Sequence, residues 1–215
     1  MLLKELREEV LKAANKLIYY HLVTLTGGNV SGRDTETGYI AITPSGIEYE
    51  NLNPEDIVIL DSQGNIIDGK LKPSVDTKVH LYIYRHMPHI NSVIHTHSIY
   101  ATCFAVLNKP IPAVTTTLAN AVGGEVPVAR YTPVGDDNMG PAIVEAIGDK
   151  LACLLENHGV ITIGPNIKAA LTAAVMLEDV AKICCFASGM GNPKVLPDSE
   201  IKKARDLYLN MYGQR

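Results

Sequence analysis

Apolar residues recur at three- and four-residue steps through the first segment of the chain, which is the spacing of an amphipathic helix. These positions run from Leu3 to Leu17, and the pattern predicts a helix that ends near Tyr20. Beyond it the helical spacing is replaced by short apolar runs bounded by turn-forming residues. The runs GYIAIT, IVILD and SVIHTH are therefore predicted to be strands.

Helices and strands alternate along the rest of the chain. Predicted helices cover SVDTKVHLYIYRH, with Ser74 as a candidate N-cap, and SIYATCFAVL, with Ser98 as its cap. VPVARY is a predicted strand, GPAIVEAIGDK a short helix, and LACLLENHGVITIG a pair of strands around a polar turn. Helices over about 167–189 and 199–212 close the chain. Because there is no strict βαβ repeat, we expect a single α/β domain over residues 1–215 with a mainly antiparallel central sheet covered on both faces.

Composition narrows the classes of function. The chain has 215 residues, of which 47% are hydrophobic, and this is enough for one sizeable core. A net charge of −4 and the lack of basic runs with interleaved aromatics argue against nucleic acid and anionic membranes as partners. The four cysteines show no C-x-x-C spacing, and there is no signal-peptide pattern or long apolar segment. We therefore expect a cytoplasmic protein.

Histidines supply the first candidate chemistry. His95 and His97 end a predicted strand at positions i and i+2, which places both rings on one face. His158 follows an apolar run in the tripeptide N-H-G, where a glycine allows a tight turn. If the three imidazoles meet, they form a divalent metal site with an open position, although each alone could be an ordinary edge or turn residue. Asp76 could complete the coordination or accept a proton, although a first-turn acid is also favoured by the helix dipole alone.

Two polar loops are candidate anion sites. The stretches T-G-G-N-V-S, residues 26–31, and T-P-S-G, residues 43–46, lie at predicted strand ends. Successive backbone N–H groups in such glycine turns form concavities that bind anions, and Ser74 could offer a further donor. Each loop alone is more often a simple turn, and neither matches a Walker A or dinucleotide motif.

Five motifs follow one another over nearly the whole chain: G-G-N-V-S, I-T-P-S-G, K-P-S-x-D followed by His80, V-I-H-T-H-S and L-x-x-N-H-G-V. Together they resemble the zinc-dependent class II aldolase and adducin family, which includes L-fuculose-1-phosphate aldolase and L-ribulose-5-phosphate 4-epimerase. The resemblance implies a three-layer α/β/α fold and a C4 homotetramer with active sites at the subunit interfaces. It also implies one zinc ion per subunit, with Mn²⁺ or Co²⁺ as substitutes, and a sugar phosphate as substrate.

The same resemblance assigns roles to residues. It implies that zinc is held by His95, His97 and His158, with Asp76 at the position of the family's acidic residue. Tyr212 matches a catalytic tyrosine near the end of the chain that would act from a neighbouring subunit. The implied phosphate pocket consists of Gly28, Asn29, Ser45, Gly46, Ser74 and the backbone of Val75, where relatives usually carry a second serine.

Retro-aldol cleavage of a phosphorylated ketose to dihydroxyacetone phosphate and an aldehyde is the activity we favour. The 4-epimerase shares the first step and stays the alternative, and a dehydratase or decarboxylase on the same scaffold stays open. The epimerase's acid/base aspartate is replaced here by Asn120, which cannot exchange a proton near neutral pH, and its histidine by Leu118. The tyrosine that fuculose aldolase places near Thr116 is also absent. The intact histidines argue against a non-catalytic module like the adducin head.

Overall fold

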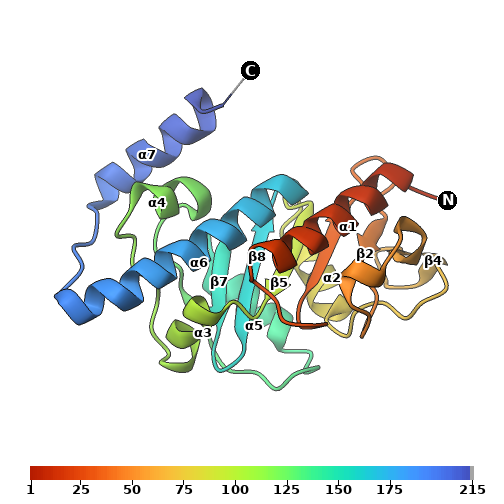
Figure 1. Cartoon of the computed structure of the whole chain (residues 1–215). Helices are drawn as coiled ribbons and strands as arrows, with labels where there is room; N and C mark the ends of the chain where they lie inside the picture. Colours follow the sequence, from red (N-terminus) through yellow and green to blue (C-terminus); the bar gives the residue numbers. More distant parts are fainter. Residues whose placement is uncertain (214–215) are drawn as a thin grey trace.

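A single sheet runs through the middle of the molecule (Figure 1), whose computed structural model describes residues 1–213. Over these residues the sheet has eight strands in the order β4-β3-β2-β1-β5-β8-β7-β6. All neighbouring pairs are antiparallel except β6 and β7. The strands are β1 (Asn29–Arg33), β2 (Ile40–Ile42), β3 (Val58–Leu60), β4 (Ile66–Asp68), β5 (Ser92–Thr96), β6 (Val128–Ala129), β7 (Ala152–Leu155) and β8 (Gly159–Gly164).

Helices cover both faces of the sheet and confirm the three-layer α/β/α architecture of a single domain. Helices α1 and α6 cross the near face in Figure 1, and α3 and α4 pack on the same side, whereas α2 and α5 pack on the opposite face. The helices are α1 (Lys4–Tyr19), α2 (Thr77–His86), α3 (Ile99–Val106), α4 (Thr116–Val122), α5 (Met139–Ile147), α6 (Ile167–Met190) and α7 (Asp198–Met211), with 3₁₀ turns at Tyr49–Asn51 and Pro54–Asp56.

Strand β5 shows why the sheet needs helices on both faces. Val93 is fully buried with residues of α2 and α5, whereas Ile94 is fully buried with residues of α1 and α6. Successive side chains of a strand point to opposite faces, and burying one of this size contributes roughly 1.5–3 kcal/mol. His95 comes two residues after Val93 and therefore points to the α2/α5 face.

The predicted elements are found, with corrections beside the histidines. Ser74 is not the N-cap of α2, because Asp76 occupies that position and the helix begins at Thr77. The N–H of Ser74 donates to the Thr43 carbonyl, and the Ser74 carbonyl accepts from the N–H of Thr77, each at 3.1 Å, which makes a turn before the helix. The stretch 29–31, predicted as loop, lies in β1, because pairing with β2 and β5 outweighs its polar composition. Helix α4 and strand β4 have no counterpart in the prediction.

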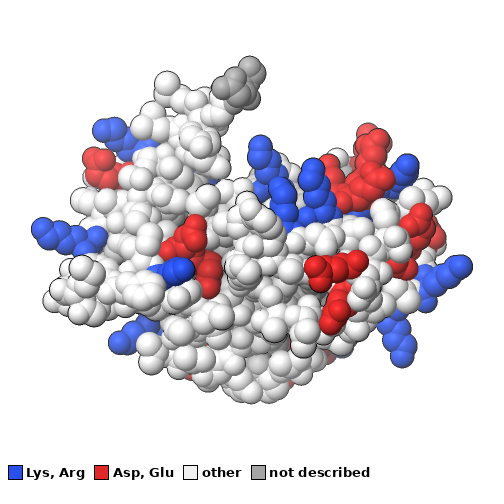
Figure 2. Space-filling model, viewed as in Figure 1, with Lys and Arg blue, Asp and Glu red and all other residues white. Residues whose placement is uncertain are grey.

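Charged side chains are mixed on the molecular surface. Figure 2 shows Lys and Arg interspersed with Asp and Glu over one face, with no large field of a single sign there. This distribution agrees with the small net charge of −4. No helix within residues 1–213 has both the length and the apolar character needed to cross a membrane.

Candidate active site

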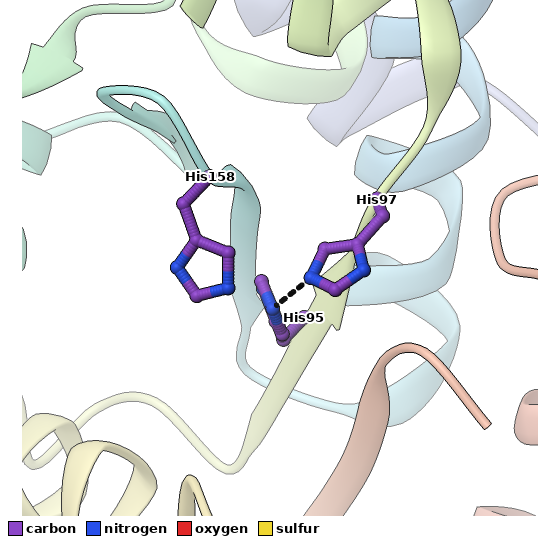
Figure 3. A group of neighbouring side chains, drawn as sticks. All are labelled: His95, His97 and His158. Carbon is purple, nitrogen blue, oxygen red and sulfur yellow. Dashed lines mark hydrogen bonds between the residues drawn. The ribbon is translucent and has the colours of Figure 1, made fainter. Parts of the chain in front are cut away.

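His95 and His97 meet at the end of β5, as their spacing predicted. His95 lies opposite Asn29 of β1 and Ile161 of β8, so the strand is held from both sides at this position. His97 follows the last residue of the strand. The Nε2 atoms of the two histidines are 3.0 Å apart, and both rings point toward a common centre (Figure 3).

His158 joins them from the turn between β7 and β8, and its ring centroid lies 4.8 and 5.2 Å from those of the other two histidines. Asn157 makes the turn with φ 56°, a conformation that asparagine tolerates better than most residues. Gly159 has a different role from the predicted one. A Cβ at this position would clash with the Thr96 carbonyl oxygen and lie 2.9 Å from Cδ2 of His97. This glycine therefore makes room for the end of β5 and its histidines rather than for the turn.

The three histidines fit a divalent cation. One nitrogen from each ring lies within 4.8 Å of the others, close enough to share one ion. Nδ1 of His95 is 2.9 Å from the carbonyl oxygen of Val160, which can only accept, so Nδ1 carries the proton and Nε2 offers its lone pair. Nδ1 of His158 is buried without a hydrogen-bond partner among the described residues. His97 is exposed, so the cluster opens to solvent on its side.

Burial keeps these rings neutral. Desolvation lowers the pKa of His95 to about 3 and also lowers the pKa of His97 and of His158. The Asp76 carboxylate acts in the opposite direction on all three pKa values, so its negative charge lies close to the cluster. The imidazoles are therefore unprotonated near pH 7, which is the form that binds metal ions.

Asp76 is held in place by Asn29. Its Oδ2 accepts a hydrogen bond of 2.7 Å from Nδ2 of Asn29, a residue that is 3% exposed and pairs with His95 across the β1–β5 ladder. Strand β1 thus connects the Asp76 carboxylate to the histidine cluster through Asn29. Among the described residues the converging ligand atoms come from the three histidines, and Asp76 stands beside them as a charge and a hydrogen-bond acceptor.

The loops predicted to bind an anion are brought together. The N–H of Ser74 donates to the Thr43 carbonyl at 3.1 Å, and the N–H of Ser45 donates to the Lys72 carbonyl at 3.0 Å. The two segments are therefore paired, and each brings one serine hydroxyl to the same region. Because these two N–H groups are already bonded, an anion here would rely on the hydroxyls and on neighbouring N–H groups.

Gly28, Gly46 and Val75 are the other predicted residues of the anion-binding loops. Gly28 has φ 121°, and a Cβ there would lie 2.8 Å from the His95 carbonyl oxygen, so the loop before β1 packs directly on β5. Gly46 has φ 71° with open space around it. Val75 is 74% exposed, so its side chain makes little contact with the chain.

The remaining predicted residues make other contacts. Tyr212 is 74% exposed and stacks on Tyr208, with ring centroids 5.1 Å apart, at the end of α7, which projects from the body of the molecule (Figure 1). Asn120, with its amide oriented to suit its neighbours, donates to carbonyls of Thr116 and of α7 at 3.1 and 2.8 Å. The backbone carbonyl of Asn120 accepts from Arg205. Asn120 is thus a packing residue between α4 and α7.

Glu178 of α6 was not predicted. It is 9% exposed, and its two carboxylate oxygens accept hydrogen bonds from the N–H groups of Tyr100 and Ala101, each 2.9 Å long. It caps α3, the helix that follows His97, whereas the predicted cap Ser98 makes no side-chain capping bond. No local pattern reveals this contact, because the partners are 78 and 77 residues apart.

His80 belongs to one of the family motifs, but no role was predicted for it. It is fully buried, and its Nδ1 lies 2.7 Å from Oγ of Ser31, which in turn lies 2.7 Å from the Tyr84 hydroxyl. Burial lowers the pKa of His80 to about 4, and the nearby Asp76 carboxylate opposes this effect. The four-residue spacing between Asp76 and His80 was the available signal in the sequence.

Comparisons with known proteins agree with this geometry. The profile described as Class II Aldolase and Adducin N-terminal domain matches residues 8–185. A 5-deoxy-D-ribulose 1-phosphate aldolase of Bacillus thuringiensis serovar kurstaki is 40% identical over 215 residues, which is the full length of both chains. A solved L-fuculose 1-phosphate aldolase superposes with a TM-score of 0.91 at 35% identity, over 95% of this chain and 96% of that one.

A further solved structure is YgbL of Escherichia coli, for which aldolase, epimerase and decarboxylase are the candidate activities. It superposes with a TM-score of 0.83 at 29% identity, over 94% of this chain and 98% of that one. The three-layer fold with a three-histidine cluster at a strand end thus defines an enzyme scaffold suited to a divalent cation. The chain belongs to the class II aldolase and adducin family.

Proposed function

We propose that this chain is a metal-dependent class II aldolase that reversibly cleaves a ketose 1-phosphate into dihydroxyacetone phosphate and an aldehyde. The observation that carries the proposal is the convergence of His95, His97 and His158 beside Asp76. Two relatives support the substrate class, because both are named for ketose 1-phosphates.

In this proposal the histidine cluster holds one zinc ion per subunit, and Mn²⁺ or Co²⁺ could replace it. Three neutral imidazoles with an open position are typical of catalytic zinc. A bound divalent cation would stabilise, by several kcal/mol, the negative charge that develops beside the ketose carbonyl during cleavage. The Val160 carbonyl orients His95 for this role, and the exposed side of His97 is where the sugar enters.

The phosphate group would be held at one end of the site by the two paired loops. The hydroxyls of Ser45 and Ser74 lie on segments that are hydrogen-bonded to each other, next to the strand that carries Asn29. Anchoring the phosphate there fixes the distance from C1 of the sugar to the histidines, which lowers the entropic cost of reaching the reactive geometry. The proposed pocket consists of Gly28, Asn29, Ser45, Gly46, Ser74 and the backbone of Val75.

Protons must move on both sides of the C3–C4 bond. The C4 hydroxyl loses a proton as this bond breaks, and C3 gains one afterwards. Asp76 is held by Asn29 beside the histidines and is the proposed group for the exchange at C3. Tyr212 of a neighbouring subunit is proposed to serve the departing aldehyde, which requires a C4 homotetramer with sites at subunit interfaces. The exposed position of Tyr212 at the end of α7 supports this role.

The experiment is to load the purified protein with zinc and to supply a panel of ketose 1-phosphates and 5-phosphates. Released dihydroxyacetone phosphate is measured by its coupled reduction, and bound metal by elemental analysis. The His95→Ala variant should lose turnover and metal together. The matched control is His86→Ala, because His86 is exposed, bonds to the Tyr82 carbonyl and stacks on the Tyr82 ring of its own helix. Full turnover by His95→Ala would exclude the proposed mechanism.

The same assay separates the alternatives. A ketose phosphate with an inverted C4 centre and no released triose phosphate would replace the aldolase with the 4-epimerase. The engagement of the Asn120 amide between α4 and α7 supports the aldolase, because that side chain is occupied by packing. Absence of a stoichiometric divalent ion would favour a non-catalytic module. We also propose a cytoplasmic location, which the free thiols of all four cysteines support.

A further inference from the structure

A chain of three buried polar side chains lies behind Asp76. His80 and Tyr84 project from α2, and Ser31 of β1 stands between them, 2.7 Å from Nδ1 of His80 and 2.7 Å from the Tyr84 hydroxyl. All three residues are at most 3% exposed. Nothing in the proposed reaction uses these groups, yet a buried polar network is costly unless its hydrogen bonds are satisfied.

The hydrogen bonds among Tyr84, Ser31 and His80 have one preferred donor–acceptor direction. The Tyr84 hydroxyl carries a single proton. The Val93 N–H donates toward its oxygen, and the acceptor found for the proton within residues 1–213 is Ser31. If Tyr84 donates to Ser31, then Ser31 donates to Nδ1 of His80, and the neutral ring carries its proton on Nε2. The reverse order would leave both the Tyr84 proton and the Nε2 lone pair without a partner. The first order leaves only the Nε2–H group of His80 unsatisfied.

The Asp76 carboxylate lies close enough to His80 for its charge to act on the pKa of that ring. Asp76 and His80 are one helical turn apart, and they face Asn29 and Ser31, which are two residues apart on the same side of β1. Nε2 of His80 and Oδ1 of Asn29 are both buried without a partner among the described residues. Buried polar atoms are normally satisfied, and a buried water typically makes about three hydrogen bonds. A water bound here would have these three partners in the carboxylate, the imidazole N–H and the amide oxygen.

We propose that His80 is a positioning residue for Asp76. The Tyr84–Ser31–His80 hydrogen bonds fix the proton of the His80 ring on Nε2, and this Nε2–H group holds the Asp76 carboxylate through one buried water. Asn29 binds Oδ2 of the carboxylate directly, and His80 adds a second constraint through the water. This role rests on the proposed function of Asp76 in proton transfer. The tautomer of His80 itself can be measured without any activity.

The first test is the tautomer. Long-range proton–nitrogen NMR spectra of the zinc-loaded protein, labelled with nitrogen-15 in histidine, distinguish the two forms, and the His80→Gln spectrum assigns the signal. The expected result is a neutral ring with its proton on Nε2. A proton on Nδ1 would overturn the proposal, whether or not the protein cleaves a ketose phosphate, and lack of cleavage with the expected tautomer would refute the proposed function alone.

The second test compares two variants that differ in the atom they keep. His80→Gln retains an N–H donor near the Nε2 position, whereas His80→Asn places its shorter amide near the Nδ1 position and has no donor at the Nε2 position. We expect His80→Asn to lower kcat about 10- to 100-fold, part of the range for general acid–base catalysis, with unchanged KM and metal content. His80→Gln should stay within about threefold of the wild-type kcat. Equal losses in both variants, or a lower metal content in His80→Asn alone, would contradict the positioning role.

Discussion

Replacing Glu178 by Ala tests whether the start of α3 depends on a carboxylate that α6 supplies. Its two oxygens accept hydrogen bonds of 2.9 Å from the N–H groups of Tyr100 and Ala101. A hydrogen bond to a charged group contributes about 1.5–3 kcal/mol, so the pair amounts to about 3–6 kcal/mol. Water can reach the partly buried Tyr100 N–H after the substitution, and we therefore expect a loss of about 3 kcal/mol in the free energy of unfolding. Glu178→Gln keeps one acceptor and should lose about half as much.

The assay is urea unfolding followed by circular dichroism at a fixed protein concentration, with metal content measured in parallel. Metal content should fall as well, because α3 begins two residues after His97. Ser98→Ala is the matched control, since the Ser98 hydroxyl is buried without a partner among the described residues, and its removal should change stability by less than about 0.5 kcal/mol. The reasoning fails if Ser98→Ala destabilises the protein as much as Glu178→Ala does.

Three further perturbations test other parts of the structure. Gly159→Ala should reduce bound metal, because the new Cβ would lie 2.9 Å from Cδ2 of His97, and stoichiometric metal in this variant would contradict the packing argument. Arg7→Ala should cost about 3–5 kcal/mol in urea unfolding, because Arg7 is 1% exposed and binds Asp68 and several carbonyls. Asp68→Asn should cost about 1 kcal/mol, because the Asp68 side chain is 41% exposed. The free energy of unfolding should fall as the pH drops from 6.5 to about 4. The pKa of His80 is lowered to about 4 in the folded protein, so in this interval the His80 ring takes up a proton in the unfolded chain and not in the folded one. The urea midpoint of His80→Gln should fall less over the same interval, and an equal fall would show that other groups cause the effect.

Much of the site follows from patterns within single elements. The i, i+2 spacing brings His95 and His97 to one side of a strand whatever the rest of the chain does, because side chains of a strand alternate between two faces. The family motifs identified the third histidine and the acidic residue beside it. The alternation of elements was also enough to predict a sheet covered on both faces, because each element has one apolar face or stripe that must be buried.

Other features depend on how distant elements pack. Ser98 has the local pattern of a helix cap, yet Glu178 caps α3, because α6 brings a carboxylate to the same N–H groups. Asn29 has the composition of a loop residue, yet strands on both sides make it part of β1. Gly159 was expected to serve its turn, but the Thr96 carbonyl and the histidines packed against it are what exclude a side chain.

The sequence by itself therefore determined the main helices and strands, the order in which they follow one another and the side of strand β5 on which His95 and His97 lie. Only the tertiary structure decided which carboxylate caps α3, which residue holds Asp76 and which histidine is buried behind it. The physical reason is that periodicity acts within one element over a few residues, whereas these contacts join elements about 50 to 80 residues apart. Their geometry is set by the packing of the whole core.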